Sequence, residues 1–496
     1  MIIDELKYRI RSVFGHVPTA EQDMAIETFA RFMTDRNEQV VMVLRGAAGT
    51  GKTSLSAAIV QALTSLEQRL VLMAPTGRAA KVFSLFSGQP AYTIHRRIYR
   101  QKSLESNFDL NYNSAQDTLF MVDEASMIAN ASSFGDTIFA GGQLMDDLIR
   151  FVYNEKNCRL MLIGDSAQLP PVGETCSPAL MSDVLRGYGL KVYECNLSEV
   201  LRQSQESGIL YNATQVRHIM EEEFGMMTLP QVRFTGFPDI RNVPGDELIE
   251  QLATSYSQVG LDDTVVITRS NKRANIYNQG IRNRVLDCED ELCGGDQIMI
   301  VKNNYSLTPN TSPKGEGDCK GEGSDMPPMT FIANGDRAVV RRVRHVHEQH
   351  GFRFADVTMT FPDYDNYELT ATVLLDTLTS EAPALTHEQQ EQLYNKVLED
   401  YADIPQKAER IKKVREDKYF NALQVKFAYA ATCHKAQGGQ WAHVYVDQGY
   451  MTDDMLTHDY LHWLYTAFTR ATEQLYLVNW PKTQTESEKV RNDLFE

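Results

Sequence analysis

The sequence predicts an α/β protein with two parallel-sheet domains, and three patterns support this fold class. Short, almost wholly apolar segments recur along the chain. Such segments are typical of parallel strands that are buried on both faces. They occupy 39–44, 69–75, 118–124, 159–165, 264–270, 425–432, 443–449 and 474–480. Helical patterns alternate with the first four segments, in the order of a doubly wound sheet. A different pattern interrupts the second set, so the second domain is expected to carry an insert.

The segment 53–66, TSLSAAIVQALTSL, is expected to form the helix between the first two strands. Its apolar side chains recur at helical spacing and therefore share one stripe. That stripe comprises Leu55, Ala58, Ile59, Ala62, Leu63 and Leu66.

The predicted insert begins in a segment rich in Gly, Pro, Ser and Asp, 303–329, which is typical of a loop. Residues 336–361 follow as a β-hairpin that turns near Gly351. A polar helical segment, 386–420, is broken by Pro405 and leads back to the α/β pattern.

Composition sets outer limits on function. The chain has 496 residues, 43% of them hydrophobic, and contains no apolar run of the ~18 residues that a membrane span needs. Its acidic beginning lacks the features of a signal peptide, so we expect a cytoplasmic protein without membrane partners. Seven scattered cysteines fit reduced thiols better than disulfides or a zinc site. The net charge of −17 lowers the expectation of a nucleic-acid partner without excluding one, because a binding groove needs only a local lining.

The segment GAAGTGKT (46–53) matches the phosphate-binding loop pattern between a predicted strand and a predicted helix. Gly46, Gly49 and Gly51 allow backbone N–H groups to turn toward phosphate oxygens. Lys52 is expected to reach the β- and γ-phosphates of ATP, and the Thr53 hydroxyl to bind Mg²⁺. Ala47, Ala48 and Thr50 complete the predicted loop. The alternative is a Gly-rich turn without a ligand.

Two carboxylates, Asp123 and Glu124, end the predicted strand 118–124. Asp123 is expected to bind Mg²⁺, and Glu124 to orient or deprotonate the attacking water. The competing interpretation is that this pair caps the next helix.

Three further side chains are candidates for the γ-phosphate. Gln168 follows the predicted strand 159–165 and is placed to hydrogen-bond that phosphate. Arg202 and Arg470 lie in SEVLRQ and YTAFTRAT, and a guanidinium stabilises the charge on a transferring phosphoryl group. Either arginine could instead form an ordinary surface salt bridge.

The order of nine motifs resembles that of superfamily 1 helicases, and of the RecD-like branch that includes the phage Dda helicase in particular. The motifs are TAEQ, GAAGTGKT, APTGRAAK, YTIHR, VDEAS, GDSAQLPPVG, LRQ, YAATCHKAQGGQW and LYTAFTRAT. They extend from residue 19 to 472, nearly the whole chain, and HKAQG and YTAFTRA are the specific ones. The resemblance implies two RecA-like domains that hold ATP between them and translocate 5′→3′ on single-stranded DNA.

The resemblance also implies domain boundaries. The first RecA-like domain is expected to comprise 1–97 and 118–200, with a small insert at 98–117. The second is expected to comprise 201–302 and 425–496, with an SH3-like β-rich insert and helical segment at 303–424.

By motif, Gln22 is expected to contact the adenine edge, and Gln437 and Gly438 to couple the nucleotide and DNA sites. The residues expected to face DNA are Pro75, Thr76, Thr93, His95, Thr432, His434 and Lys435. Hydroxyls, imidazoles and backbone N–H groups at the carboxyl ends of strands contact phosphates without reading base sequence. The threonines and histidines could equally be satisfied within the protein.

Several positions depart from the family pattern or leave it open. Cys433 and Ala436 stand where many relatives carry an aliphatic residue and a serine, and Ala436 cannot supply the serine hydroxyl to a coupling role of this loop. Phe108 and Tyr112 are candidates for a strand-separating pin, and a plain polar turn is the alternative. The insert offers Arg341, Arg342 and Arg344 as phosphate contacts or a solvated face, and His345, His347 and His350 as a less favoured metal cluster.

An ATP-driven DNA helicase acting as a monomer at single-strand and junction DNA is therefore the leading hypothesis. A translocase or remodelling ATPase that does not separate strands shares the same motor residues. A P-loop kinase of small molecules is less favoured, because it leaves the second α/β domain and both arginines unexplained.

Overall fold

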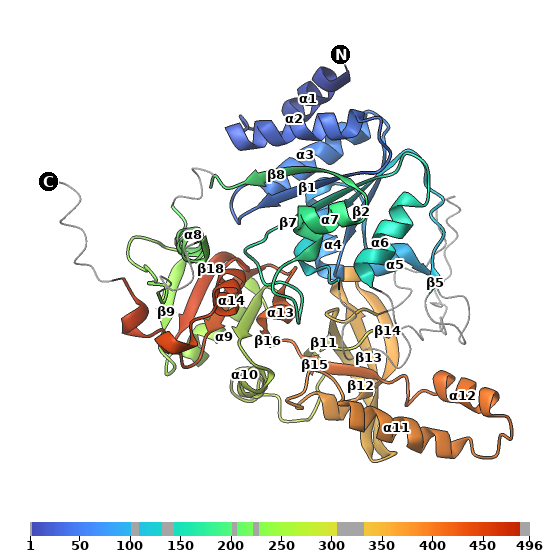
Figure 1. The fold of residues 1–496 in the computed structure, drawn as a ribbon. Coiled ribbons are helices and arrows are strands. Elements are labelled where there is room, and N and C mark those ends of the chain that lie inside the picture. The colour runs from blue at the N-terminus through green and yellow to red at the C-terminus, as the bar shows by residue number, and fades with distance from the viewer. Residues whose placement is uncertain are drawn as a thin grey trace, which may run out of the picture. The chain divides into compact units, whose positions relative to one another are not determined.

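The computed structural model describes residues 2–100, 109–130, 143–200, 206–221, 228–304 and 332–486 (Figure 1). The chain divides into two compact units. The first comprises Met1–Ile98, Leu110–Asp287 and Tyr429–Glu496, and the second Tyr99–Asp109 and Cys288–Ala428. No helix in the described ranges is long and apolar enough to cross a bilayer.

The first unit contains a six-stranded sheet in the order β3-β2-β6-β7-β1-β8, and every neighbouring pair is parallel. The strands are β1 (Val40–Gly46), β2 (Arg69–Ala74), β3 (Ala91–Thr93), β6 (Thr118–Val122), β7 (Arg159–Gly164) and β8 (Lys191–Leu197). The central strands are buried on both faces, as their apolar sequences predicted. Because all strands run the same way, the loops after them lie at one edge of the sheet.

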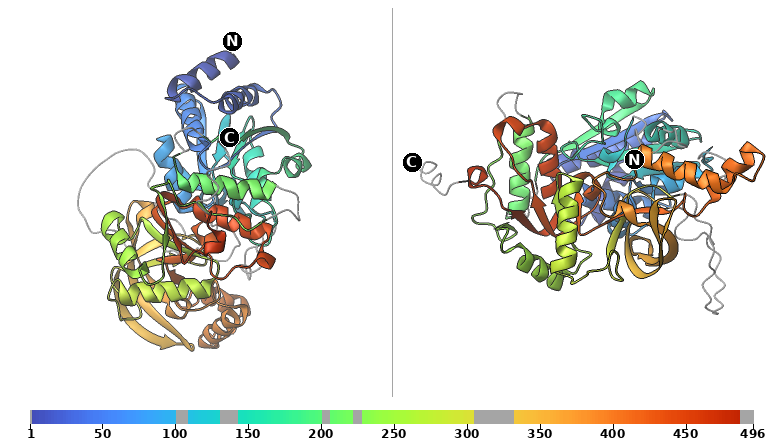
Figure 2. Two further views of the ribbon diagram at one scale, coloured as in Figure 1. Left: turned by 90° about the vertical axis from the view of Figure 1, so that its left-hand side faces the viewer. Right: turned by 90° about the horizontal axis from the view of Figure 1, so that it is seen from below.

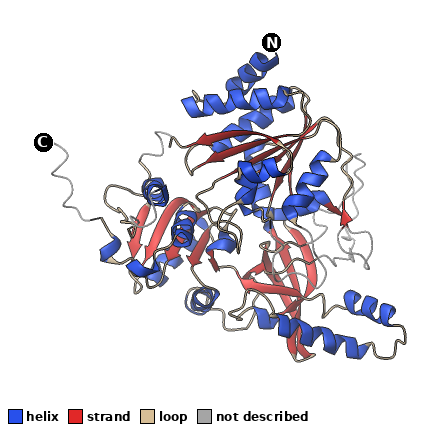
Figure 3. Ribbon diagram, in the orientation of Figure 1, coloured by secondary structure: helices blue, strands red, loops and turns tan. Residues whose placement is uncertain are grey.

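Helices flank this sheet (Figure 3). They are α1 (Ile2–Val13), α2 (Ala20–Thr34), α3 (Lys52–Ser65), α4 (Gly77–Ser87), α5 (Ile94–Ile98), α6 (Leu144–Tyr153) and α7 (Ser182–Gly187). In α3 the predicted stripe is buried from Leu55 to Leu63, whereas Leu66 is 39% exposed. Leu66 lies at the C-cap, where the helical periodicity no longer sets the direction of the side chain.

A second parallel sheet in the same unit has the order β16-β10-β17-β18-β9. Its strands are β9 (Ile240–Val243), β10 (Thr264–Thr268), β16 (Ala430–Thr432), β17 (Trp441–Asp447) and β18 (Ala471–Val478). Its helices are α8 (Gly208–Glu221), α9 (Leu248–Val259), α10 (Asn271–Arg284), α13 (Cys433–Ala436) and α14 (His458–Phe468). The predicted fold class, two RecA-like parallel sheets with inserts, is thereby confirmed.

The predicted single strand 425–432 is wrong: it is two strands in different sheets. Leu423–Phe427 forms β15 of the second unit, and Ala430–Thr432 forms β16 of the second parallel sheet. The apolar run is continuous across Ala428 and Tyr429, so the sequence pattern carried no mark of the point where the chain leaves one sheet for the other.

The second unit contains a closed five-stranded barrel, β11-β12-β13-β14-β15, which confirms the predicted β-rich insert. Its strands are β11 (Gln297–Ile300), β12 (Arg337–Gln349), β13 (Phe352–Phe361), β14 (Tyr367–Leu374) and β15 (Leu423–Phe427). Strands β12 and β13 form the predicted hairpin at Gly351 and are gold in both views of Figure 2. The predicted helical segment forms α11 (His387–Asp400) and α12 (Lys407–Glu416), with the break around Pro405.

Where a small first insert was predicted, β4 (Tyr99–Arg100) pairs with β5 (Asp109–Leu110) in a two-stranded sheet. The predicted boundaries 98–117 and 303–424 stay predictions. Pin candidate Phe108 lies outside the described residues. The other candidate, Tyr112, is 61% exposed, and its hydroxyl donates to Glu155.

Candidate active site

The loop between β1 and α3 has the shape that its glycines predict. Gly49 and Gly51 adopt left-handed φ angles of 77° and 82°, where glycine avoids the strain of a side chain. The Thr50 N–H and hydroxyl both donate to the Ala47 carbonyl, at 3.4 and 2.8 Å, and close the loop. A Cβ on Gly46 would lie 2.8 Å from Lys52 Cγ. The loop backbone therefore opens at the N-terminus of α3, where a phosphate is favoured.

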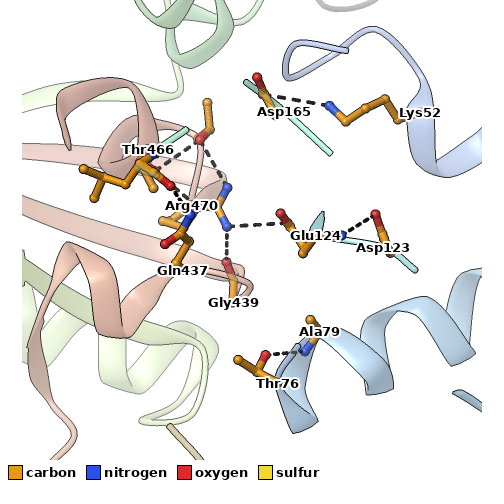
Figure 4. Close-up of polar contacts among 12 residues, drawn as sticks. Lys52, Thr76, Ala79, Asp123, Glu124, Asp165, Gln437, Gly439, Thr466 and Arg470 are labelled. Carbon is orange, nitrogen blue, oxygen red and sulfur yellow. Dashed lines mark hydrogen bonds and ion pairs between the residues drawn. The ribbon is translucent and has the colours of Figure 1, made fainter. Parts of the chain in front are cut away.

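Lys52 extends from the first turn of α3 into this loop. Its ammonium donates to the Gly46 carbonyl and, at 2.9 Å, to the Ala47 carbonyl. The ammonium also lies 3.9 Å from the Asp165 carboxylate (Figure 4). These partners belong to the loop and to the end of β7. The ammonium is therefore held where phosphate oxygens could replace them as its partners.

Gln22 lies under the loop, at the start of α2. Its Nε2 donates to the Thr50 carbonyl at 2.9 Å, and its Oε1 accepts the Thr19 N–H at 3.0 Å in a capping box. A glutamine amide has two N–H groups and two lone pairs on oxygen. One N–H donor and one acceptor lone pair of the Gln22 amide thus remain. They match the adenine edge, where N7 accepts a hydrogen bond and the N6 amino group donates one.

Asp123 and Glu124 follow β6, two strands from β1 in the sheet. Asp123 accepts the Glu124 N–H at 2.9 Å, and Glu124 adopts a left-handed φ of 52°. Burial, together with the neighbouring Glu124 charge, raises the pKa of Asp123 well above its usual range. A divalent cation held by Asp123 and the Thr53 hydroxyl would remove this cost, so the donor set fits Mg²⁺.

Arg470 reaches this carboxylate pair from the second sheet. It follows α14 and is 2% exposed. Its guanidinium donates to the Thr466 and Gly439 carbonyls, each at 3.1 Å, and lies 3.9 Å from Glu124 (Figure 4). One guanidinium is therefore fixed by the second sheet and directed at the first. The other predicted arginine, Arg202, lies outside the described residues.

The loop after β7, residues 165–169, is contacted at several points by the second sheet. Asp165 accepts the Tyr465 hydroxyl at 2.6 Å, and the Ala167 carbonyl lies 2.9 Å from His462 Nδ1. Leu169 donates its N–H to Thr466 Oγ1 at 2.7 Å. These three α14 residues are spaced i, i+3 and i+4, so they share one helix face.

Two predicted residues complete this contact. Gln437 Nε2 donates to the Leu169 carbonyl at 2.6 Å, which links the second sheet to the loop. Gln168 is 5% exposed, and its Oε1 has no hydrogen-bond partner among the described residues. An unpaired buried oxygen is costly, and a group entering the nucleotide site would satisfy it.

The residues predicted to face DNA lie at the same edge of each sheet but on other strands. Pro75 and Thr76 follow β2, and Thr93 ends the neighbouring β3. The Thr76 hydroxyl accepts the Ala79 N–H at 3.2 Å as the N-cap of α4. Its own hydrogen is therefore available as a donor.

On the second sheet, Thr432 ends β16, and His434 and Lys435 lie in the short α13 that follows. His95, in α5, has a pKa lowered to about 4 by burial, so its ring is neutral at neutral pH. These outer strands are separate from the central strands β1, β6 and β7 that carry the loop, Asp123 and Asp165.

Gly438 lies where the two sheets meet. Its φ is 75°, and a Cβ there would lie 3.1 Å from Thr76 Oγ1 and 3.3 Å from Met127 Sδ. The neighbouring Cys433 and Ala436, where the motif departs from the family, are both buried. Their small, apolar side chains serve packing rather than hydrogen bonding to a ligand.

Three residues at this interface were not predicted from the sequence. All three lie inside quoted motifs: Asp165 accepts the Tyr465 hydroxyl, and the Arg78 guanidinium stacks over the Trp441 ring, 4.5 Å from its centroid. Asp165 had a readable signal, because it directly follows a buried parallel strand. Tyr465 and Arg78 had none, since their partners are 300 and more residues away in the chain.

In the barrel unit, the three histidines of the hairpin turn to separate partners. His345 lies 3.1 Å from Asp356, His347 contacts the Tyr419 hydroxyl at 3.2 Å, and His350 lies 3.2 Å from Asp400. Within the described ranges, no group of three or more His, Cys, Asp or Glu could hold a metal ion.

Comparison with known families matches two segments of the chain. A model described as an AAA domain matches residues 19–227, and a UvrD-like helicase C-terminal domain matches residues 427–478. The first match covers the loop, Asp123, Glu124 and Gln168, and the second covers Gln437 and Arg470.

Two curated proteins are similar over about half of the chain. The ATP-dependent RecD2 DNA helicase of Deinococcus radiodurans is 34% identical over 278 residues, 54% of this chain and 34% of that protein. The ATP-dependent DNA helicase dda of Enterobacteria phage T4 is 26% identical over 270 residues, 52% of this chain and 56% of that protein. The matched region thus spans only about a third and about half of these relatives.

Among solved structures, the Pif1 helicase from Bacteroides in complex with ADP-AlF3 and ssDNA aligns over 95% of both chains. The identity is 14% and the TM-score 0.44, too low to support a statement about any residue.

Proposed function

We propose that this chain, which belongs to the RecD-like superfamily 1 helicases, is an ATP-driven 5′→3′ DNA helicase. The observation that carries the proposal is the position of Arg470, fixed by the second sheet yet 3.9 Å from Glu124 of the first. A nucleotide site assembled from both sheets makes hydrolysis depend on how the sheets meet. Hydrolysis is thereby tied to movement of the two sheets relative to each other, and this movement carries the protein along a bound DNA strand.

Lys52 and the loop amides hold the phosphates of ATP in this scheme. The ammonium leaves the Gly46 and Ala47 carbonyls for the β- and γ-phosphates, and Gln22 offers its remaining donor and acceptor to adenine. Thr53 and Asp123 would hold Mg²⁺, which neutralises phosphate charge during transfer. Because all these groups lie on the first sheet, binding does not require the second.

Hydrolysis requires Glu124 and Arg470 together. A water oxygen forms a bond to the γ-phosphorus while the bond to the bridging oxygen of ADP breaks, and Glu124 accepts the water proton. Before ATP enters, the Arg470 guanidinium lies 3.9 Å from the Glu124 carboxylate. When the guanidinium turns to the γ-phosphate, it stabilises the transferring group and frees the carboxylate as a base.

Single-stranded DNA is proposed to lie along the outer strands of both sheets. Thr76 and Thr93 donate hydroxyls from the first sheet, and Thr432, His434 and Lys435 contact the strand from the second. Pro75 and His95 line the same track. Contacts to phosphate and sugar position the strand without sequence specificity. Gln437 and Gly438 lie between this track and the loop at 165–169, which supports their coupling role.

We also propose that the protein acts as a monomer. Arg470 and Glu124 belong to one chain, so the centre is completed without a second copy. Sedimentation of the protein on a forked DNA in the presence of a nonhydrolysable ATP analogue tests this, with a single copy per fork expected.

The decisive experiment compares ATP turnover with and without single-stranded DNA, followed by unwinding of duplexes with a 5′ or a 3′ tail. We expect stimulation by DNA and unwinding only from the 5′ tail. Turnover indifferent to DNA would favour the small-molecule kinase instead. Stimulation without unwinding from either tail would favour a translocase or remodelling ATPase.

Lys52→Ala is the matched control for that experiment. It should abolish turnover and leave single-strand binding close to wild type, because the DNA track uses other strands. Full turnover in this variant would refute the role assigned to the loop.

A further inference from the structure

We infer that the hydroxyl of Tyr465 is a positioning group that links the phosphate-binding loop and Asp165 to helix α14, and so sets where Arg470 stands. This inference rests on the proposed function, because it concerns how the same ATPase centre responds to DNA. Tyr465 comes from the second sheet, whereas both of its polar partners belong to the first.

The hydroxyl makes two hydrogen bonds, one to each loop. It donates to Asp165 Oδ2 at 2.6 Å and accepts the Ala48 N–H at 2.8 Å. A neutral phenol has one donor and can accept, so both contacts are made at once. Tyr465 is 1% exposed, and water therefore does not compete for either bond.

The two partners are groups whose surroundings change when a phosphate is bound. Ala48 lies within the loop itself, and Asp165 is the carboxylate that Lys52 approaches at 3.9 Å. When Lys52 turns to a phosphate, Asp165 keeps the Ala167 N–H, at 3.0 Å, and the Tyr465 hydroxyl as its donors. The bond to Tyr465 consequently strengthens as the loop is filled, because the carboxylate has lost a competing cation.

Helix α14 also connects Tyr465 to Arg470. Thr466, the residue after Tyr465, accepts the Arg470 Nε at its carbonyl and the Leu169 N–H at its hydroxyl. A displacement of Tyr465 toward the loop moves Thr466 with it, since both lie on one turn of α14. Arg470 is thereby placed relative to Glu124 by the state of the loop.

The test removes the hydroxyl and keeps the ring. Tyr465→Phe is compared with Tyr460→Phe, a second buried tyrosine on α14 whose hydroxyl donates to Gln448 at 2.6 Å within the second sheet. Both variants lose one buried hydroxyl, so similar losses of thermal stability are expected. For each protein, kcat and the KM for ATP are measured with and without saturating single-stranded DNA, alongside Tm and DNA affinity.

We expect Tyr465→Phe to lower the DNA-stimulated kcat roughly tenfold, with the KM for ATP changed less than about threefold. Tyr460→Phe should retain the wild-type kcat.

Two results would overturn the inference: a wild-type DNA-stimulated kcat in Tyr465→Phe, or equal losses of kcat in Tyr465→Phe and Tyr460→Phe. Both presuppose that DNA stimulates the wild-type protein. If it does not, the proposed function itself fails, and that outcome is separated from the first two by the wild-type measurement alone. If Tyr465→Phe does not fold, the same kinetic comparison is made with Thr466→Val. Loss of DNA stimulation is again expected, and full stimulation would contradict the link.

Discussion

Glu124 is held in an unusual backbone conformation directly after β6. A left-handed φ at a residue with a side chain costs on the order of 1–2 kcal/mol, so it persists only where neighbouring contacts fix it. Here Asp123 donates its N–H to the Met73 carbonyl, and its carboxylate accepts the Glu124 N–H. These bonds fix the backbone of Glu124, whose carboxylate lies 3.9 Å from the Arg470 guanidinium.

Single residues of the site differ in how far the sequence predicts them. The loop from Gly46 to Thr53 is local: its glycines, lysine and threonine act within one turn, and their spacing is readable in the chain. Tyr465 acts through partners on another sheet, so nothing in its neighbourhood marks it. The roles of Gln22, Gln168 and the seven DNA-facing residues stay predictions.

Cys433 offers a pH-dependent test at the residue scale. Burial raises the pKa of its thiol to about 12, and its sulfur faces the Trp463 carbonyl. At pH 9 only about one molecule in a thousand then carries the thiolate that alkylating reagents attack. We predict that Cys176, which is exposed, is alkylated at pH 9 while Cys433 stays unmodified.

Mass spectrometry of peptides after timed alkylation checks this, with urea-unfolded protein as the control in which both cysteines react. Modification of Cys433 at a rate similar to that of Cys176 in the folded protein would contradict the buried position of this motif.

At the scale of elements, long apolar strands and their order were predictable because parallel strands are buried on both faces. Three strands of the parallel sheets were not predicted: β3 is only three residues long, and polar residues interrupt the apolar ones in β8 and β9. The division of 425–432 between two sheets could not be predicted either. Both parts are buried, so the residues on either side of Ala428 are similarly apolar.

The turn between α13 and β17 gives a prediction at this scale. Gly438→Ala adds a Cβ 3.1 Å from Thr76 Oγ1, whereas Gly449→Ala adds one with nothing within 4 Å. Both glycines have positive φ, 75° and 71°, so each variant carries a similar backbone strain of about 1 kcal/mol. We predict that only Gly438→Ala loses most of its DNA-stimulated ATP turnover.

Equal Tm values for the two alanine variants would show that the strain is matched. Equal turnover in both, at equal Tm, would mean that the contact between Gly438 and Thr76 does not matter for coupling.

For the whole molecule, the net charge of −17 constrains how DNA is held. Of the seven residues proposed to face the strand, only Lys435 carries a formal positive charge at neutral pH. Each neutralised phosphate on a single strand contributes about −0.7 to the slope of log K against log salt. We therefore predict a slope shallower than about −2 for single-strand binding, measured by fluorescence anisotropy across salt concentrations.

Replacing Arg341, Arg342 and Arg344 together with alanine should leave that slope unchanged. A slope of about −4 or steeper, reduced by this triple replacement, would instead assign the phosphate contacts to the barrel unit.

The central claim is that ATP is split only when the second sheet supplies Arg470 to a nucleotide held by the first. The most direct test is the rate of ATP turnover by Arg470→Ala at saturating single-stranded DNA, with nucleotide affinity measured in parallel by a fluorescent ATP analogue. The account predicts a loss of about a thousandfold in turnover with affinity within a few-fold of wild type. Turnover within twofold of wild type would contradict it.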